Sequence, residues 1–358
     1  MSIIRFSCDR TTLFAPTDTG QFVDADYDRA THVGRLGALD DVAALDKAID
    51  GHLAALWPAR AGALTAEAPV AILAHGFLFD PRDKPLPPPF DTSNPHGCIY
   101  HFLKRELLEE SRNHDTGWAG RLGFSDGDQG AQGVAIGFGW FSSPKIGISL
   151  GEWHRNFYAE ACRIADGTAG VLARVVLALQ RRLKSHPVDI VAHSMGTWLT
   201  VATLRLLLAE RKQAVARLGR IILMGGSAYT KDAAALALAL ETLSGPDVYN
   251  FASRSDDVLE DLARFCGPSM AHPESVIGYD GLGLKLDHWI SIQLDDPKLQ
   301  VWGEHALGHA LRAEFPDGKL FNEWADHWAY YVFDGNTATM ADILRKRAAI
   351  VAVLPSNT

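Results

Sequence analysis

Short apolar segments that alternate with longer helical patterns constrain the fold of this chain more than any other feature. Five segments are almost continuously apolar and rich in β-branched side chains. Strands of this kind are buried on both faces, which is typical of a parallel sheet whose connections are helices. The predicted strands are residues 69–76, 133–141, 188–194, 220–226 and 247–253.

The segments between these strands predict helices and two long insertions. Residues 102–111, 168–185 and 197–213 carry an apolar stripe at helical spacing, and the segment that begins at Asp40 is also predicted to be helical. The fold class is therefore α/β, with a mostly parallel central sheet covered by helices on both faces. The predicted organisation is a less regular N-terminal element over 1–65, packed on a domain over 66–358 that carries loop insertions at about 78–132 and 265–322, in a single compact unit.

Charge and cysteine usage exclude several classes of protein. The 358 residues have a formal charge of −9 and contain no long basic run, which disfavours nucleic acid and anionic membranes as partners. No apolar run is long enough to span a membrane, and the N-terminus lacks the continuous apolar core of a secretion signal. Cys8, Cys98, Cys162 and Cys266 lack CxxC spacing, so they predict reduced thiols in a cytoplasmic protein, with signal-independent export as the alternative.

The stretch "VDIVAHSMGTW" contains the candidate nucleophile. A buried strand ends at Ser194 and a helical pattern begins at once, so the turn must be sharp and must hold the serine at positive φ. Such a turn needs small residues two positions before and after the serine, where Ala192 and Gly196 stand. It also leaves the Met195 N–H free to stabilise an oxyanion. The alternative is that Ser194 only caps the following helix.

This stretch resembles the nucleophile elbow of the α/β-hydrolase superfamily, in esterase and lipase branches where alanine replaces the first glycine of G-x-S-x-G. By element order the resemblance covers residues 68–350. It implies a serine hydrolase that cleaves carboxylic esters through an acyl-enzyme, with thioesterase, amidase or acyltransferase activity as variants on the same residues. It also implies that an acidic residue and then a histidine follow the serine along the chain.

The segment "AILAHGF" is the candidate for the second half of an oxyanion hole. A strand ends in His-Gly, and the resemblance implies that this strand lies beside the nucleophile strand with the Phe77 N–H facing the serine. The alternative is an ordinary turn at the end of a strand.

The segment "RSDDVLEDL" resembles the acid loop of these hydrolases, in which an aspartate follows a strand end and precedes a small apolar pair. The resemblance implies that Asp256, after the predicted strand 247–253, fits best as the acid. Asp257 is the alternative if the loop register differs by one residue, and Asp232 follows the preceding strand. The competing interpretation of the Asp256 and Asp257 pair is helix N-capping.

His327 is the candidate base, in a loop before a final helix that is predicted to begin near Asn336. His288 and His309 are the alternatives, and His193 and His75 flank the site at positions that do not suit a base. His305 and His309 share a helix face, but Glu304 precedes both instead of lying between them. We therefore predict neither a metal nor a cofactor.

Substrate choice is expected to depend on the two insertions, since loops at the carboxyl ends of strands build the pocket of an open α/β sheet. Leu78, Trp140 and Trp328 are the candidate pocket residues, and they favour a small-molecule or lipid ester with an apolar acyl part. Ordinary core packing is the alternative for each tryptophan. The competing functions are a noncatalytic binding protein with a hydrolase fold and a lipase secreted without a signal peptide; the sequence indicates no oligomeric state.

Overall fold

A computed structural model gives the arrangement of the chain. The structure describes residues 3–10, 12–16, 33–61, 64–65, 67–81, 94–100, 117–124, 126–127, 130–131, 133–143, 153–184, 186–265, 274–304, 310–313, 327, 331 and 333–345.

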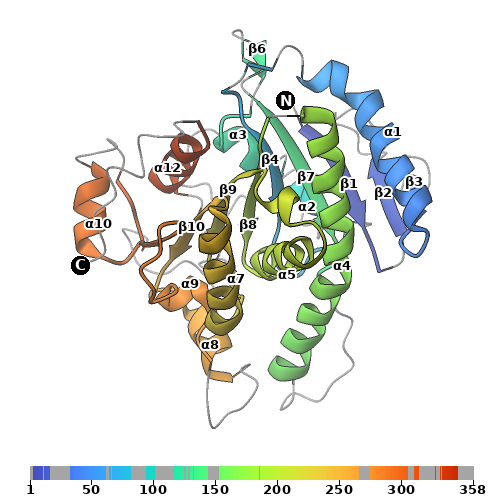
Figure 1. Cartoon of the computed structure of the whole chain (residues 1–358). Coiled ribbons are helices and arrows are strands. Elements are labelled where there is room, and N and C mark those ends of the chain that lie inside the picture. Colours follow the sequence, from blue (N-terminus) through green and yellow to red (C-terminus); the bar gives the residue numbers. More distant parts are fainter. Residues whose placement is uncertain are drawn as a thin grey trace.

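Nine of the described strands form one large sheet in the order β11-β10-β9-β8-β4-β7-β1-β2-β3 (Figure 1). Every neighbouring pair from β11 to β1 is parallel, whereas β2 runs antiparallel to both β1 and β3. All five predicted strands are present, as β4, β7, β8, β9 and β10. The strands are β1 (Ile3–Cys8), β2 (Thr12–Pro16), β3 (Val33–Ala38), β4 (Val70–Ala74), β7 (Val134–Trp140), β8 (Val188–His193), β9 (Leu218–Met224), β10 (Asp247–Ala252) and β11 (Trp289–Gln293).

Helices follow most of the parallel strands, as the alternation predicts. The predicted helices at 168–185 and 197–213 lie in α4 and in α5 with α6, and the segment from Asp40 forms α1. The predicted helix at 102–111 lies outside the described residues. The longer helices are α1 (Val42–Ala61), α4 (Trp153–Leu183), α5 (Met195–Glu210), α7 (Thr230–Leu243), α8 (Asp257–Phe265) and α12 (Asp334–Arg345), and the shorter ones are α2 (Pro95–Cys98), α3 (Trp118–Arg121), α6 (Lys212–Val215), α9 (Ile277–Asp280) and α10 (Pro297–Trp302).

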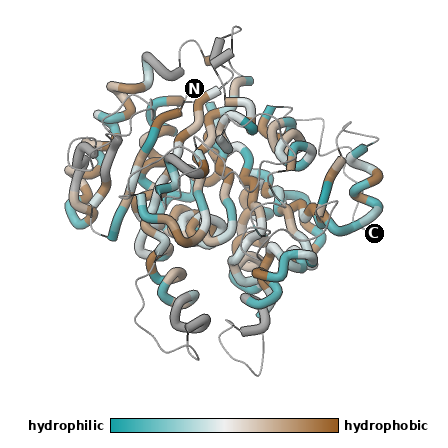
Figure 2. Tube along the Cα trace, turned by 180° about the vertical axis from the view of Figure 1, so that it is seen from behind, coloured by the Kyte–Doolittle hydropathy of each residue, from teal (hydrophilic) through white to brown (hydrophobic). Residues whose placement is uncertain are grey.

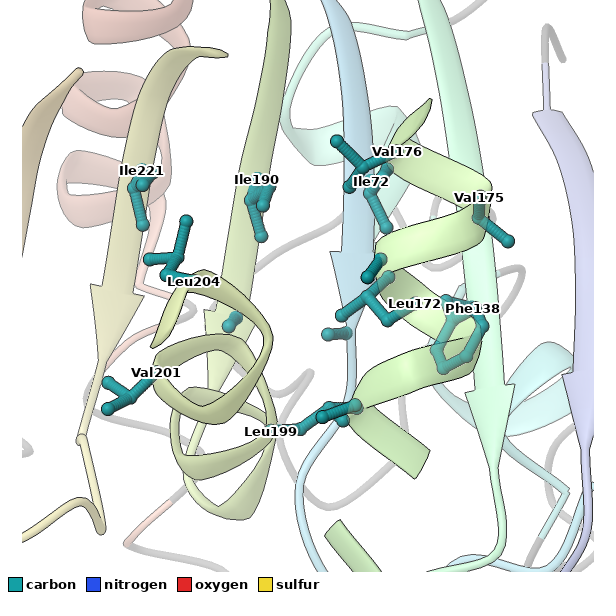
Figure 3. Close-up of a cluster of buried hydrophobic side chains, with 14 of the residues drawn as sticks. Ile72, Phe138, Leu172, Val175, Val176, Ile190, Leu199, Val201, Leu204 and Ile221 are labelled. Carbon is teal, nitrogen blue, oxygen red and sulfur yellow. The ribbon is translucent and has the colours of Figure 1, made fainter. Parts of the chain in front are cut away.

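Both faces of the sheet are covered, because successive side chains of a buried strand point to opposite sides. On β4, Val70 and Ile72 join a cluster with α1, α4, α5 and α7, while Ala71 and Leu73 join a cluster with α3 and α12. Apolar residues follow the central strands in Figure 2. In Figure 3, side chains of α4 and α5 point toward Ile72, Phe138, Ile190 and Ile221 on four adjacent strands. The predicted α/β class, with a mostly parallel central sheet covered by helices on both faces, is confirmed.

The N-terminal residues differ from the less regular element that the sequence predicts over 1–65. β1 is buried along its whole length and pairs with β7, so this region extends the central sheet. Arg5 and Ser7 interrupt the apolar pattern of β1, which is why the pattern does not indicate a buried strand. Both side chains are nevertheless buried.

The two insertions contain short elements where the structure describes them. The first includes α2, α3 and the small hairpin of β5 (Asp126–Gly127) and β6 (Gly130–Ala131). The second includes α9, β11 and α10. β11 lies at the end of the sheet and is only partly buried, so its sequence lacks the continuous apolar pattern of the central strands.

Among the helices that the structure describes, none combines the length and the apolar character needed to cross a lipid bilayer.

Candidate active site

Ser194 occupies a sharp turn between β8 and α5. Its φ of 52° and ψ of −122° lie outside the ordinary regions for a residue with a side chain, and such a conformation costs about 1–3 kcal/mol. Ser194 stands at the N-cap position of α5, yet its side chain makes no capping hydrogen bond. Helix capping therefore does not account for the strained conformation of Ser194.

Two glycines let β4 approach this turn. A Cβ atom on Gly196 would lie 2.4 Å from the Ala74 carbonyl oxygen and 2.6 Å from that of His75. A Cβ atom on Gly76 would lie 2.8 Å from the Ser194 Cβ. Distances below 3.0 Å are not accommodated without a shift, so larger side chains at these positions would separate the end of β4 from Ser194.

Backbone hydrogen bonds fix the strained residue in place. The Ser194 N–H donates to the Met224 carbonyl at 2.9 Å. The Ser194 carbonyl accepts from Thr197 Oγ1 at 2.6 Å and from Ser227 Oγ at 3.1 Å. No local pattern in the sequence indicates Thr197 or Ser227, because one side chain comes from α5 and the other from the loop after β9.

The structure brings together the candidate acid and the candidate base. His327 Nδ1 lies 2.7 Å from Asp256 Oδ2, although 71 positions separate the two residues, and both side chains are buried. Asp256 Oδ1 also accepts from the Leu259 N–H at 3.3 Å, at the start of α8. Asp256 can therefore pair with a histidine and also cap a helix, because Oδ2 bonds His327 while Oδ1 bonds the first turn of α8. Asp257 is the first residue of α8.

The second ring nitrogen of His327, Nε2, is the atom through which such a histidine would exchange a proton. Nε2 is buried and has no hydrogen-bond partner in the part of the chain that the structure describes. The His327 ring lies against the ring of His193, with centroids 4.8 Å apart. Because His193 immediately precedes Ser194, His327 is held beside the turn.

The other candidates are elsewhere or outside the described residues. His288 Nδ1 lies 2.9 Å from Asp247 Oδ1, before β11 and at the start of β10, which is the opposite edge of the sheet from Ser194. Asp232 is in the first turn of α7 and pairs with Arg205 near the surface. His305 and His309 lie outside the described residues.

His75 supports the predicted oxyanion turn after β4. Its Nε2 accepts from the Trp140 N–H at 2.9 Å, so the proton is on Nδ1, which donates to the Gly76 carbonyl at 2.9 Å. Burial lowers the pKa of His75 to about 3, so the ring is neutral near pH 7. Because a peptide unit is planar, this bond fixes the Gly76–Phe77 peptide that carries the Phe77 N–H.

Tyr100 and Ser142 also form hydrogen bonds with the segment after β4. The Tyr100 hydroxyl accepts from the His75 N–H at 3.0 Å and lies within hydrogen-bond distance of the Leu73 carbonyl. Ser142, just after β7, accepts from the Leu78 and Phe79 N–H groups through its carbonyl and its hydroxyl. No local pattern indicates these contacts, because each joins segments that are distant in sequence.

The predicted pocket residues differ in their surroundings. Leu78 has a φ of 71° and is 45% exposed, which is unusual for a bulky apolar residue. Trp140 does not line an open pocket: its side chain is completely buried, its ring stacks on His75, and its Nε1–H donates to the His75 carbonyl. Trp140 lies at the end of β7, where it packs against the turn that follows β4. Trp328 lies outside the described residues.

The parallel sheet with helices on both faces and the strand-to-helix turn at Ser194 define an α/β-hydrolase fold. Residues 119–265 match the model of a family described as "Alpha/beta hydrolase of unknown function (DUF900)". This match supports the assignment of the chain to the α/β-hydrolase superfamily. The match includes Ser194 and Asp256 and ends before His327. No curated protein matches the chain significantly.

Proposed function

We propose that this chain is a serine hydrolase that cleaves carboxylic esters with an apolar acyl part. One observation carries the proposal. The Asp256–His327 pair is buried and leaves His327 Nε2 without a partner in the described chain, at the sheet edge where Ser194 is held at positive φ. A carboxylate that orients a histidine beside a serine hydroxyl is the arrangement that activates a serine.

The proposed reaction has two halves. Ser194 Oγ attacks the ester carbonyl carbon while His327 Nε2 takes the hydroxyl proton, and Asp256 stabilises the imidazolium that forms. His327 then gives this proton to the leaving alcohol, which leaves an acyl group on Ser194. In the second half a water molecule loses its proton to His327 and attacks the acyl carbon, so the acid is released and the serine recovers its proton.

The proposed oxyanion donors are the backbone N–H groups of Met195 and Phe77. Met195 is the first residue of α5, so its N–H has no acceptor within the helix, and the helix dipole favours negative charge there. The bonds that His75 makes support a fixed orientation of the Phe77 N–H. Fixed donors stabilise a developing oxyanion without reorganising, and loss of one typically costs about 10²–10³-fold in kcat.

The apolar character of the substrate is proposed from Leu78. Its exposed side chain follows the oxyanion turn within two residues of Gly76, which contacts the Ser194 turn. The bonds to Ser142 hold it in that strained position. Strained residues that persist at such a location are commonly part of the binding machinery.

A fluorophosphonate probe tests the proposal, since it reacts with activated serines. We expect the wild-type chain to be labelled and Ser194→Ala to remain unlabelled. Ser291→Ala is the matched control, because Ser291 lies on β11 away from the turn, and it should be labelled like the wild type. An unlabelled wild-type chain would favour a noncatalytic binding protein with this fold.

A panel of p-nitrophenyl esters of rising acyl length defines the substrate class. We expect kcat/KM to rise with chain length beyond acetate, because an apolar contact stabilises longer acyl groups by about 0.8 kcal/mol per buried CH₂. A preference for acetate would contradict the apolar acyl part. Faster turnover of matched thioesters or amides would reassign the activity to those variants of the same chemistry.

A further inference from the structure

We infer that Tyr331 is a positioning residue: its hydroxyl bonds the same carboxylate oxygen of Asp256 that bonds His327, and so controls how strongly the acid acts on the base. The Tyr331 hydroxyl donates to Asp256 Oδ2 at 3.0 Å, and the same oxygen lies 2.7 Å from His327 Nδ1. This inference rests on the proposed function, because it concerns how the acid acts on the base.

The position of the Tyr331 ring is fixed by its packing. The side chain is completely buried in the apolar cluster on the α12 side of the sheet. Gly225 faces the ring, and a Cβ atom there would lie 2.5 Å from a ring carbon. Gly225 also has a φ of 52°, so glycine is favoured on both grounds. The chain thus leaves a space beside β9 that the tyrosine ring fills.

The Tyr331 ring also packs near the rings of His193 and His327. The ring centroid lies 5.6 Å from that of His193 and 6.2 Å from that of His327. Burial first, and then the charge of His327, lower the pKa of His193 well below its usual range, so His193 does not compete for the proton. Three titratable groups of the described chain contact His327: Asp256 on the loop before α8, His193 at the end of β8, and Tyr331. His75 acts electrostatically on His193.

The shared oxygen has a chemical consequence. A buried carboxylate needs hydrogen-bond donors, and those that bond the charged form stabilise it. The tyrosine hydroxyl therefore donates to the carboxylate and holds Oδ2 toward His327. It also shares the negative charge of Oδ2 with the His327 bond, so removing the hydroxyl leaves more of that charge for His327.

Tyr331→Phe tests this inference, because it removes the hydroxyl and keeps the ring. We expect the acidic limb of the kcat/KM profile to move up by about 0.5 pH unit, and kcat to fall about 3- to 10-fold at its optimum. The matched control is Tyr249→Phe on β10. It removes the hydroxyl of another buried tyrosine, which contacts Arg220 on the neighbouring strand β9. The control should leave the acidic limb where it is in the wild type.

Gly225→Ala provides a second test that retains the hydroxyl. The added methyl group displaces the ring, so we expect the acidic limb to move in the same direction as in Tyr331→Phe. Thermal unfolding of each variant shows that the profiles come from folded protein. An unmoved limb in folded Tyr331→Phe overturns this inference alone. A wild-type chain that neither hydrolyses esters nor reacts with fluorophosphonate overturns the proposed function, and this inference with it.

Discussion

The two edges of the central sheet each carry an aspartate–histidine pair with nearly the same geometry. At the carboxyl edge, Asp256 and His327 are 2.7 Å apart, with side chains 0% and 5% exposed. At the amino edge, Asp247 and His288 are 2.9 Å apart, with side chains 30% and 26% exposed. Distance alone does not separate a candidate catalytic pair from a surface contact.

The surroundings separate the two pairs. The partly exposed pair of Asp247 and His288 contributes little to stability, because water screens the interaction. The buried pair lies beside a strained serine, a neutral histidine and a tyrosine that shares its carboxylate oxygen. Loops at the carboxyl ends of parallel strands converge on one edge, so this edge can gather groups from many segments. The comparison predicts large effects at one edge and small effects at the other.

The largest difference is expected for the two histidines. His327→Ala should lower kcat for ester hydrolysis at least about 10⁴-fold, because the serine proton then has no acceptor. His288→Ala should leave kcat within about twofold. Steady-state kinetics on a p-nitrophenyl ester measures both, and equal losses would remove the distinction between the two edges.

Substitution of Asp256 should likewise lower kcat far more than substitution of Asp247. Asp256→Asn is expected to reduce kcat about 10³- to 10⁴-fold, since an amide favours the wrong tautomer of His327 and cannot stabilise its positive charge. Asp247→Asn is the control at the amino edge and should retain nearly full activity. A strong effect of Asp257→Asn together with a weak effect of Asp256→Asn would move the acid by one residue.

The pH dependence of stability should also come from the carboxyl edge. The pKa of His75 is about 3 in the folded chain and about 6.5 when unfolded, so the unfolded chain binds the proton more readily between these values. This stability is fully present above about pH 6.5 and is lost as the pH falls toward 3. Between pH 7 and 5 His75 alone should cost about 2 kcal/mol, and His193 adds in the same direction.

Urea unfolding at pH 7 and pH 5 measures this loss. His75→Gln should be less stable at pH 7 and should lose less of its free energy of unfolding on acidification. His288→Gln, at the amino edge, should keep the wild-type difference between the two pH values. A wild-type difference that survives in His75→Gln would mean that other groups dominate.

The smallest expected effect concerns two exposed leucines. Leu78→Gly relieves a positive φ and should raise the free energy of unfolding by about 0.5 kcal/mol, while kcat/KM falls more for long acyl chains than for acetate. Leu284 is similarly exposed, at 42%, in the loop that leads to His288, and its φ is not positive. Leu284→Gly should slightly destabilise the chain and leave activity unchanged. A destabilised Leu78→Gly would show that its backbone is not strained.

Much of the fold follows from the pattern of the sequence. The five central strands are buried on both faces, so their apolar runs indicate them directly. The strands at the two ends of the sheet are less apparent, because β1 contains Arg5 and Ser7 and β11 is only partly buried. Residues 102–111 and 328 carry predictions that lie outside the described chain.

The sequence by itself determined the class of fold and the turn at Ser194, because burial periodicity and steric crowding are local properties that neighbouring residues reveal. Only the tertiary structure decided which aspartate meets which histidine. Asp256 and His327 are 71 positions apart, and their local signals resemble those of Asp257 and His288. It also decided the places of His75, Trp140 and Tyr331, since hydrogen bonds between distant segments leave no periodic pattern in the chain.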